Sequence, residues 1–124
     1  MMFAMTKSLR LLALAAALMA AAPAMAQSRY LSMAEDIPLM PGLTEADNAG
    51  MVFDKPDGRI VEAYATGAVT TLAVTRFYAA TLPQLGWRRE SDFRYRREVE
   101  HLQLTVTGRD GALTLRFDIA PTER

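Results

Sequence analysis

The chain has 124 residues, of which 14 are basic and 14 acidic, so its formal net charge is zero. This balance gives no electrostatic reason to expect binding to nucleic acid. The sequence contains no cysteine, which excludes disulfides, thiol catalysis and metal sites with cysteine ligands.

The first 26 residues have the features of a secretory signal peptide. Lys7 and Arg10 form a basic start, residues 11–22 are an apolar run, and residues 24–26 give the small-x-small pattern of a cleavage site. The apolar run has 12 residues, well short of the ~20 that a membrane-spanning helix needs. We therefore expect cleavage after Ala26, a periplasmic location and no membrane span in the mature chain. An uncleaved leader that tethers the protein is the alternative.

The expected mature chain has 98 residues, which is long enough for one domain with its own core. Without the two basic residues of the leader it has 12 basic and 14 acidic side chains. We divide it into an extended strap (residues 27–50), an α+β domain (residues 51–120) and a short tail (residues 121–124).

The strap contains Pro38 and Pro41, which oppose a helix and favour an extended chain. It also carries four large apolar side chains that should avoid water: Ile37, Leu39, Met40 and Leu43. They either cover the core or a sheet edge, or they form a docking segment for another envelope protein. Both interpretations remain open at this point.

Residues 51–65 have the pattern of a β-hairpin. Pro56 and Asp57 suit the central positions of a type I turn, and Gly58 can adopt the conformation that follows it. In the second strand, small or branched side chains at alternate positions share one face. We expect that face to lie under the helix that follows.

Residues 70–87 contain the predicted helix of the mature chain. Thr70 is a suitable N-cap, Gly86 suits a left-handed helix end, and Pro83 should break or kink the helix. Steps of three and four residues place one group of apolar side chains on a single stripe. The stripe consists of Val74, Phe77, Tyr78, Leu82 and Leu85.

The remainder, up to Pro121, has the period of two that is typical of strands with one wet face. Asp110 and Gly111 predict a hairpin turn there. The polar face should consist of Gln103, Thr105, Thr107, Thr114, Arg116 and Asp118. These elements predict a two-layer α+β domain in which one amphipathic helix packs on a mostly antiparallel sheet of about five strands, in the order β-β-α-β-β-β.

The sequence predicts no catalytic, cofactor-binding or metal-binding residue. His101 is the only histidine, so no second imidazole can complete a metal site, and a structural position is its ordinary explanation. The strap has four carboxylates without the alternating spacing and central glycine of a calcium loop. They are Glu35, Asp36, Glu45 and Asp47.

Five arginines fall within ten residues and alternate with two aromatic side chains. They are Arg88, Arg89, Arg94, Arg96 and Arg97. Four neighbouring carboxylates leave this stretch almost neutral, which favours cross-strand ion pairs and protection of a sheet edge. The alternative is that Arg94 and Arg96 bind an acidic partner or a lipid head group. We keep these two arginines, with the four apolar strap residues, as candidate partner-binding residues.

The end of the helix and the hairpin turn resemble those of a family of small, uncharacterised exported bacterial proteins. The residues that carry the resemblance are Gly58-Arg59-Ile60-Val61, Phe77-Tyr78 and Leu82-Pro83-Gln84-Leu85-Gly86-Trp87. The resemblance covers residues 36–120 or so and implies a periplasmic location. It carries over no catalytic residue.

Export, small size and the lack of a convergent catalytic set favour a non-enzymatic periplasmic interaction or accessory module, in envelope assembly or protein quality control, that needs no cofactor. Its partner would be another envelope protein, which the strap or an edge strand would contact. The alternative is a small-molecule-binding protein or enzyme with a pocket between helix and sheet, using Tyr64, His101 or Tyr78.

Overall fold

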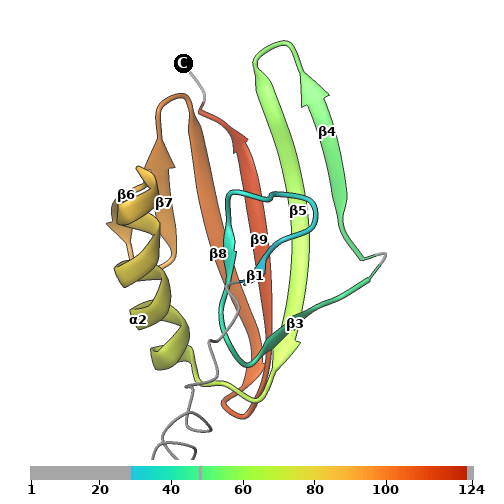
Figure 1. Ribbon diagram of the computed structural model, residues 1–124, viewed down its shortest axis with the longest axis vertical. Coiled ribbons are helices and arrows are strands. Elements are labelled where there is room, and N and C mark those ends of the chain that lie inside the picture. The colour runs from blue at the N-terminus through green and yellow to red at the C-terminus, as the bar shows by residue number, and fades with distance from the viewer. Residues whose placement is uncertain (1–28, 48, 123–124) are drawn as a thin grey trace, which may run out of the picture.

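The computed structural model describes residues 29–47 and 49–122. The expected signal peptide and its cleavage site lie outside these residues and stay predictions. The part that the structure describes is an α+β fold with a helix packed on an antiparallel sheet, as predicted (Figure 1). None of its helices has the length and hydropathy that crossing a membrane would require.

Within the described residues, seven strands form the main sheet. They are β3 (Leu43–Glu45), β4 (Met51–Lys55), β5 (Gly58–Gly67), β6 (Arg88–Ser91), β7 (Arg94–Arg97), β8 (Glu100–Arg109) and β9 (Ala112–Pro121). The order is β3-β5-β9-β8-β7-β6, with β4 also beside β5, and every pair is antiparallel. The predicted five strands in the order β-β-α-β-β-β were too few. A further strand, β3, lies in the strap and pairs with the end of β5, and four strands rather than three follow the helix.

The turns between strands form where the sequence predicts them. Lys55 pairs with Gly58 across the turn that Pro56 and Asp57 make, and Gly111 has φ 91° between β8 and β9. Between β7 and β8 the turn contains Glu98, a residue other than glycine with positive φ (53°). The predicted hairpins are therefore present, and the turn at Glu98 forms without glycine.

The predicted helix divides into α2 (Thr71–Thr81) and the 3-10 turn η1 (Leu82–Leu85). Thr70 caps α2, since its Oγ1 accepts a hydrogen bond from the N–H of Ala73 at 3.1 Å. Pro83 falls in η1, where the α-helix has already ended, and Gly86 terminates the turn with φ 92°. The cap, the break and the helix end all agree with the sequence prediction.

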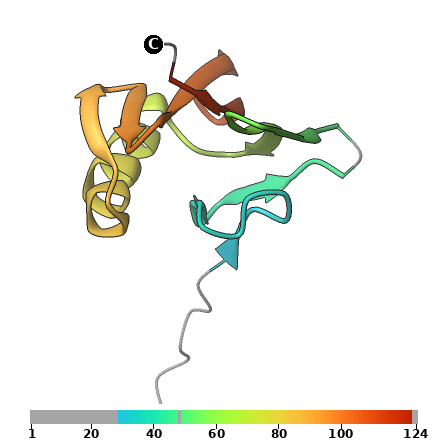
Figure 2. The same ribbon diagram turned by 90° about the horizontal axis from the view of Figure 1, so that it is seen from above.

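The helix and the strap lie side by side on the same face of the sheet, as the view from above shows (Figure 2). The strap contains a two-stranded ladder of β1 (Arg29–Tyr30) and β2 (Pro38–Leu39). Val61, Ala63 and Ala65 of β5 are at most 1% exposed on this face. The expectation that α2 covers them was wrong, because the strap crosses in front of β5 while α2 lies on the side of β7 and β8 (Figure 1).

The other face of the sheet is open and polar, as the alternation in β8 and β9 predicts. On β9 the four inward side chains are at most 2% exposed, whereas the residues between them are partly exposed. The inward residues are Leu113, Leu115, Phe117 and Ile119. One face of the sheet is thus packed under the strap and α2, and the other is available for contacts.

Candidate functional site

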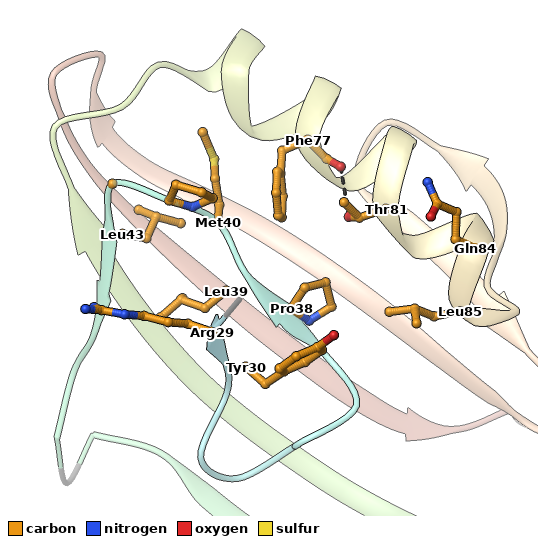
Figure 3. Close-up of a pocket in the computed structure, with 12 residues that line it drawn as sticks. Arg29, Tyr30, Pro38, Leu39, Met40, Leu43, Phe77, Thr81, Gln84 and Leu85 are labelled. Atoms are coloured by element: carbon orange, nitrogen blue, oxygen red, sulfur yellow. Dashed lines mark hydrogen bonds between the residues drawn. The ribbon is translucent and has the colours of Figure 1, made fainter. Parts of the chain in front are cut away.

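An open groove of about 580 Å³ runs between the strap and the helix. Figure 3 shows side chains of α2 and η1 along one side of it and side chains of the strap along the other. Its apolar lining includes Tyr30, Leu39, Met40, Leu43, Phe77 and Leu85. Its polar lining consists of Arg29, Thr81 and Gln84.

The hydroxyl of Tyr78 sets the distance between the two sides of the groove. It donates a hydrogen bond to the carbonyl of Pro38 at 2.9 Å and accepts one from the N–H of Met40 at 3.3 Å. Burial raises the pKa of Tyr78 above its usual value, and the Met40 N–H offsets this only in part. The hydroxyl therefore keeps its proton at neutral pH, and the helix holds the strap's backbone in place through one buried side chain.

Two side chains at the edge of the groove remain unusually exposed for their size. Tyr30 is 47% exposed and Leu85 is 38% exposed. Phe77 also lines the groove and is half-buried, with its ring 4.9 Å from that of Tyr78 in an edge-to-face arrangement. The groove thus offers aromatic and aliphatic groups to solvent.

The polar groups that line the groove are largely committed to the helix itself. The Thr81 hydroxyl donates to the carbonyl of Phe77 at 2.8 Å, and the Gln84 side-chain amide donates to the carbonyl of Ala80 at 2.9 Å. A nucleophile would need an adjacent general base, and neither group contacts one. The apolar lining of the groove is suited to binding an apolar group.

An ion-pair cluster fastens the strap beyond one end of the groove, and we call it the clasp: Asp36, Arg59, Arg97 and Glu100. Arg59 lies 2.8 Å from Asp36 and 3.1 Å from Glu100. Arg97 pairs with Asp36 and lies 3.0 Å from Glu100. Asp36 belongs to the strap, whereas the other three belong to β5, β7 and β8, so the clasp joins the strap to three strands of the sheet.

Arg97 also connects the clasp to the helix end. Its Nη1 donates to the carbonyl of Leu85 at 3.2 Å, and its guanidinium lies 4.3 Å from the ring centre of buried Trp87. Leu85 is consequently held at the rim of the groove by its own backbone. The position of this groove residue depends on the clasp.

The electrostatics of the clasp favour the ionised form of Asp36. Partial burial tends to raise the pKa of this carboxyl, but hydrogen bonds from Arg59 and Arg97 outweigh burial and lower it to about 2. The pKa of Arg59 is raised, chiefly by its hydrogen bond to Asp36. Both charges are therefore present throughout the physiological pH range.

The four candidate strap residues are all buried, and three of them also line the groove. Ile37 and Leu43 are at most 3% exposed in the core. Leu39 and Met40 are 7% and 9% exposed, and both line the groove. The strap therefore covers the sheet with Ile37, and it contributes Leu39, Met40 and Leu43 to the candidate site. A docking role for these four residues stays a prediction.

The five arginines do not form one patch, because neighbouring residues of a strand point to opposite faces. Arg94 and Arg96 lie on the open face, opposite Gln103 and His101 of β8. Arg97 points toward Trp87 on the covered face. A role for Arg94 and Arg96 in binding an acidic group also stays a prediction.

The other candidates from the sequence lie apart from one another. Tyr64 and His101 are on the open face, away from Tyr78, and the Tyr64 hydroxyl donates to Glu62 at 2.6 Å, which raises the pKa of Tyr64. In the strap, Glu45 accepts hydrogen bonds from the N–H and hydroxyl of Ser32. Within residues 29–47 and 49–122, no three histidine or carboxylate side chains gather as a metal site.

The chain matches no protein-family model, no curated protein and no solved structure. The resemblance to small exported bacterial proteins therefore stays a prediction.

Proposed function

We propose that the protein is a non-enzymatic interaction module of the bacterial periplasm, which binds a short apolar segment of a partner protein in the groove between the strap and α2. The observation that supports this most directly is the presence of two exposed apolar side chains in an open groove, with Tyr30 at 47% and Leu85 at 38% exposure. Large apolar groups gathered in one groove are typical of binding sites. The predicted export of the chain supports the compartment.

The shape of the groove favours a peptide segment over a small molecule. A small-molecule site usually encloses most of its ligand, whereas this groove is open to solvent beside Tyr30 and Leu85. An open groove beside a helix accommodates a chain that continues beyond both ends of the contact. Met40 adds an adaptable side chain, which suits recognition of segments with related but unequal side chains.

A small apolar ligand is the second candidate. The volume of about 580 Å³ falls within the range of roughly 300–1,000 Å³ that is usual for small-molecule sites. The binding experiment described next distinguishes the peptide from the small ligand.

The test compares two exposed leucines of the helical segment. Leu85 lies in the groove, whereas Leu72 is 57% exposed outside it, so Leu72→Glu is a matched control for Leu85→Glu. Ten-residue peptides selected on the purified protein from a random library are labelled, and their affinities are measured by fluorescence anisotropy. We expect Leu85→Glu to weaken binding at least tenfold and Leu72→Glu to leave it unchanged, with equal thermal stability of both variants.

Three results would count against the peptide. The proposal fails if the library yields no binder, or if both substitutions reduce affinity equally. A neutral apolar dye that binds the wild type, is displaced by no selected peptide and is lost in Leu85→Glu would favour the small-molecule alternative.

A further inference from the structure

Two arginines face each other on the open side of the sheet. Arg88 of β6 lies directly opposite Arg96 of β7, and His101 of β8 is the next residue across the sheet. Like charges at directly opposed positions destabilise a sheet unless a counter-charge is near. Both arginine side chains are exposed, so an external anion can reach them.

Among residues 29–47 and 49–122, carboxylates do not neutralise this arginine pair. Two other arginines of the open face have partners, since Arg94 lies 3.5 Å from Glu90 and Arg116 lies 2.9 Å from Asp118. In the part of the chain that the structure describes, no ion pair involves Arg88 or Arg96. An anion bound between them would supply the missing counter-charge.

A broad groove begins at Arg96 and continues over apolar residues. Its volume is about 980 Å³. Arg96 and Lys55 contribute positive charge to its walls and Asp57 contributes one negative charge. The apolar part consists of Ile60, Val99, Ala120 and Pro121, together with Pro56. The positive charge of Arg96 and the apolar surface beyond it are the two features that an amphiphilic anion matches.

The apolar surface extends beyond the groove to the edge of the sheet. Phe53 of β4 is 56% exposed and lies directly opposite Ile60 of β5. Val99, in the turn between β7 and β8, is 61% exposed at the other side of the groove. Four strand spacings of about 4.8 Å separate β7 from β4, so the path from Arg96 to Phe53 is about 19 Å long.

We propose that this end of the open face binds an anionic amphiphile, with a phosphate or carboxylate head group between Arg88 and Arg96 and its apolar chain along the groove toward Ile60 and Phe53. Guanidinium groups bind such head groups by paired, charge-assisted hydrogen bonds. Burying the apolar chain against Ile60 and Val99 adds the hydrophobic contribution. The ligand is a free single-chain amphiphile or a membrane lipid of the same chemistry.

The site is separate from the groove between the strap and α2. The two lie on opposite faces of the sheet, because Arg96 and Ile60 belong to the open face and Phe77 belongs to the covered face. Either proposal can therefore fail without the other.

The first experiment titrates the purified protein with decyl phosphate, decanol and inorganic phosphate, and follows backbone amide shifts by NMR. We expect decyl phosphate to shift the amides of Ile60, Val99 and Ala120 and to bind at least tenfold more tightly than either decanol or phosphate alone. Added salt should weaken the binding. Equal affinity for decanol, or shifts confined to Phe77 and Leu85, would overturn the proposal.

The second experiment uses a matched pair of arginine variants. Arg76 is exposed on α2 and has no ion pair among the described residues, so Arg76→Gln removes an equivalent charge elsewhere. We expect Arg96→Gln to weaken decyl phosphate binding at least tenfold and Arg76→Gln to leave it unchanged. Arg96→Gln should fold normally, because it relieves the repulsion from Arg88. Equal effects of the two variants would refute the site.

A third arm distinguishes the two sources of the ligand. Co-sedimentation with phosphatidylglycerol vesicles, compared with phosphatidylcholine vesicles, tests for a lipid in a membrane. Vesicle binding that is lost in Arg96→Gln and retained in Arg76→Gln identifies the membrane as the source. Binding of decyl phosphate without vesicle binding identifies a free amphiphile, and absence of both contradicts the proposal.

Discussion

Replacing Asp36 by asparagine should release the strap from the clasp and destabilise the fold. The pKa of Asp36 is lowered from 3.8 to about 2 by the two arginines, against the effect of burial. Each unit of pKa shift corresponds to about 1.4 kcal/mol, so complete shielding from solvent would give about 2.5 kcal/mol. The Asp36 side chain is 38% exposed, and solvent screening reduces the expected loss to about 1–2 kcal/mol.

The pH dependence identifies the source of this loss. A carboxyl with a lowered pKa in the folded state stabilises the fold above its unfolded pKa, and the contribution disappears as the pH falls through the folded value. The difference in unfolding free energy between the wild type and Asp36→Asn should therefore be constant above pH 5 or so and shrink between about pH 4 and pH 2.

Urea unfolding followed by fluorescence measures this difference, because Trp87 is the only tryptophan and is 2% exposed. Glu35→Gln, which removes a neighbouring exposed charge outside the clasp, is the control and should change stability little. A loss in Asp36→Asn that stays constant down to pH 2, or an equal loss in Glu35→Gln, would refute the assignment of the stabilisation to the clasp.

Two further substitutions and one control variant test how the strap is held. Tyr78→Phe removes the hydroxyl that is hydrogen-bonded to two buried backbone groups of the strap. It should lower the free energy of unfolding in urea by about 1–3 kcal/mol, and an unchanged stability would contradict this bridging role. Gly67→Ala places a methyl group 2.0 Å from the carbonyl oxygen of Gly42 and should cost about 3 kcal/mol, measured in the same way. Gly111→Ala is the control, because its methyl group would meet no neighbouring atom while the backbone keeps φ at 91°; it should cost only about 1 kcal/mol. Equal losses of stability at the two glycines would argue against a close approach of the strap to β5.

The elements that the sequence predicts correctly are specified by nearby residues. The ends of the helix follow from Thr70 and Gly86, and the first hairpin follows from the turn at Pro56 and Asp57. In each case the determining side chain acts within a few positions of its own backbone. Alternation in β8 and β9 likewise identifies the covered and open faces without knowledge of the partner strands.

The strap could not be placed in this way, because its contacts are distant in the sequence. Asp36 meets Arg59 and Arg97, which lie 23 and 61 residues away, and no spacing rule connects such positions. Leu43 begins a strand only because the end of β5 offers a free edge beside Gly67. Leu85 was expected in the buried stripe, yet the 3-10 turn rotates it from the α-helical register to the rim of the groove.

The arginine stretch shows how strand geometry changes the meaning of a sequence cluster. Arg96 and Arg97 are neighbours in the chain, but the period of two sends Arg96 to the open face and Arg97 to the clasp beside Trp87. Arg97 shares two carboxylates with Arg59 and helps to hold the strap, whereas Arg96 faces another arginine and has no such partner among the described residues. A net charge summed over the whole stretch is close to neutral and does not distinguish the paired arginine from the unpaired one. Substitutions at Arg96 should therefore alter anion binding at constant stability, and substitutions at Arg97 should lower stability, because the strand separates a binding charge from a structural one at consecutive positions.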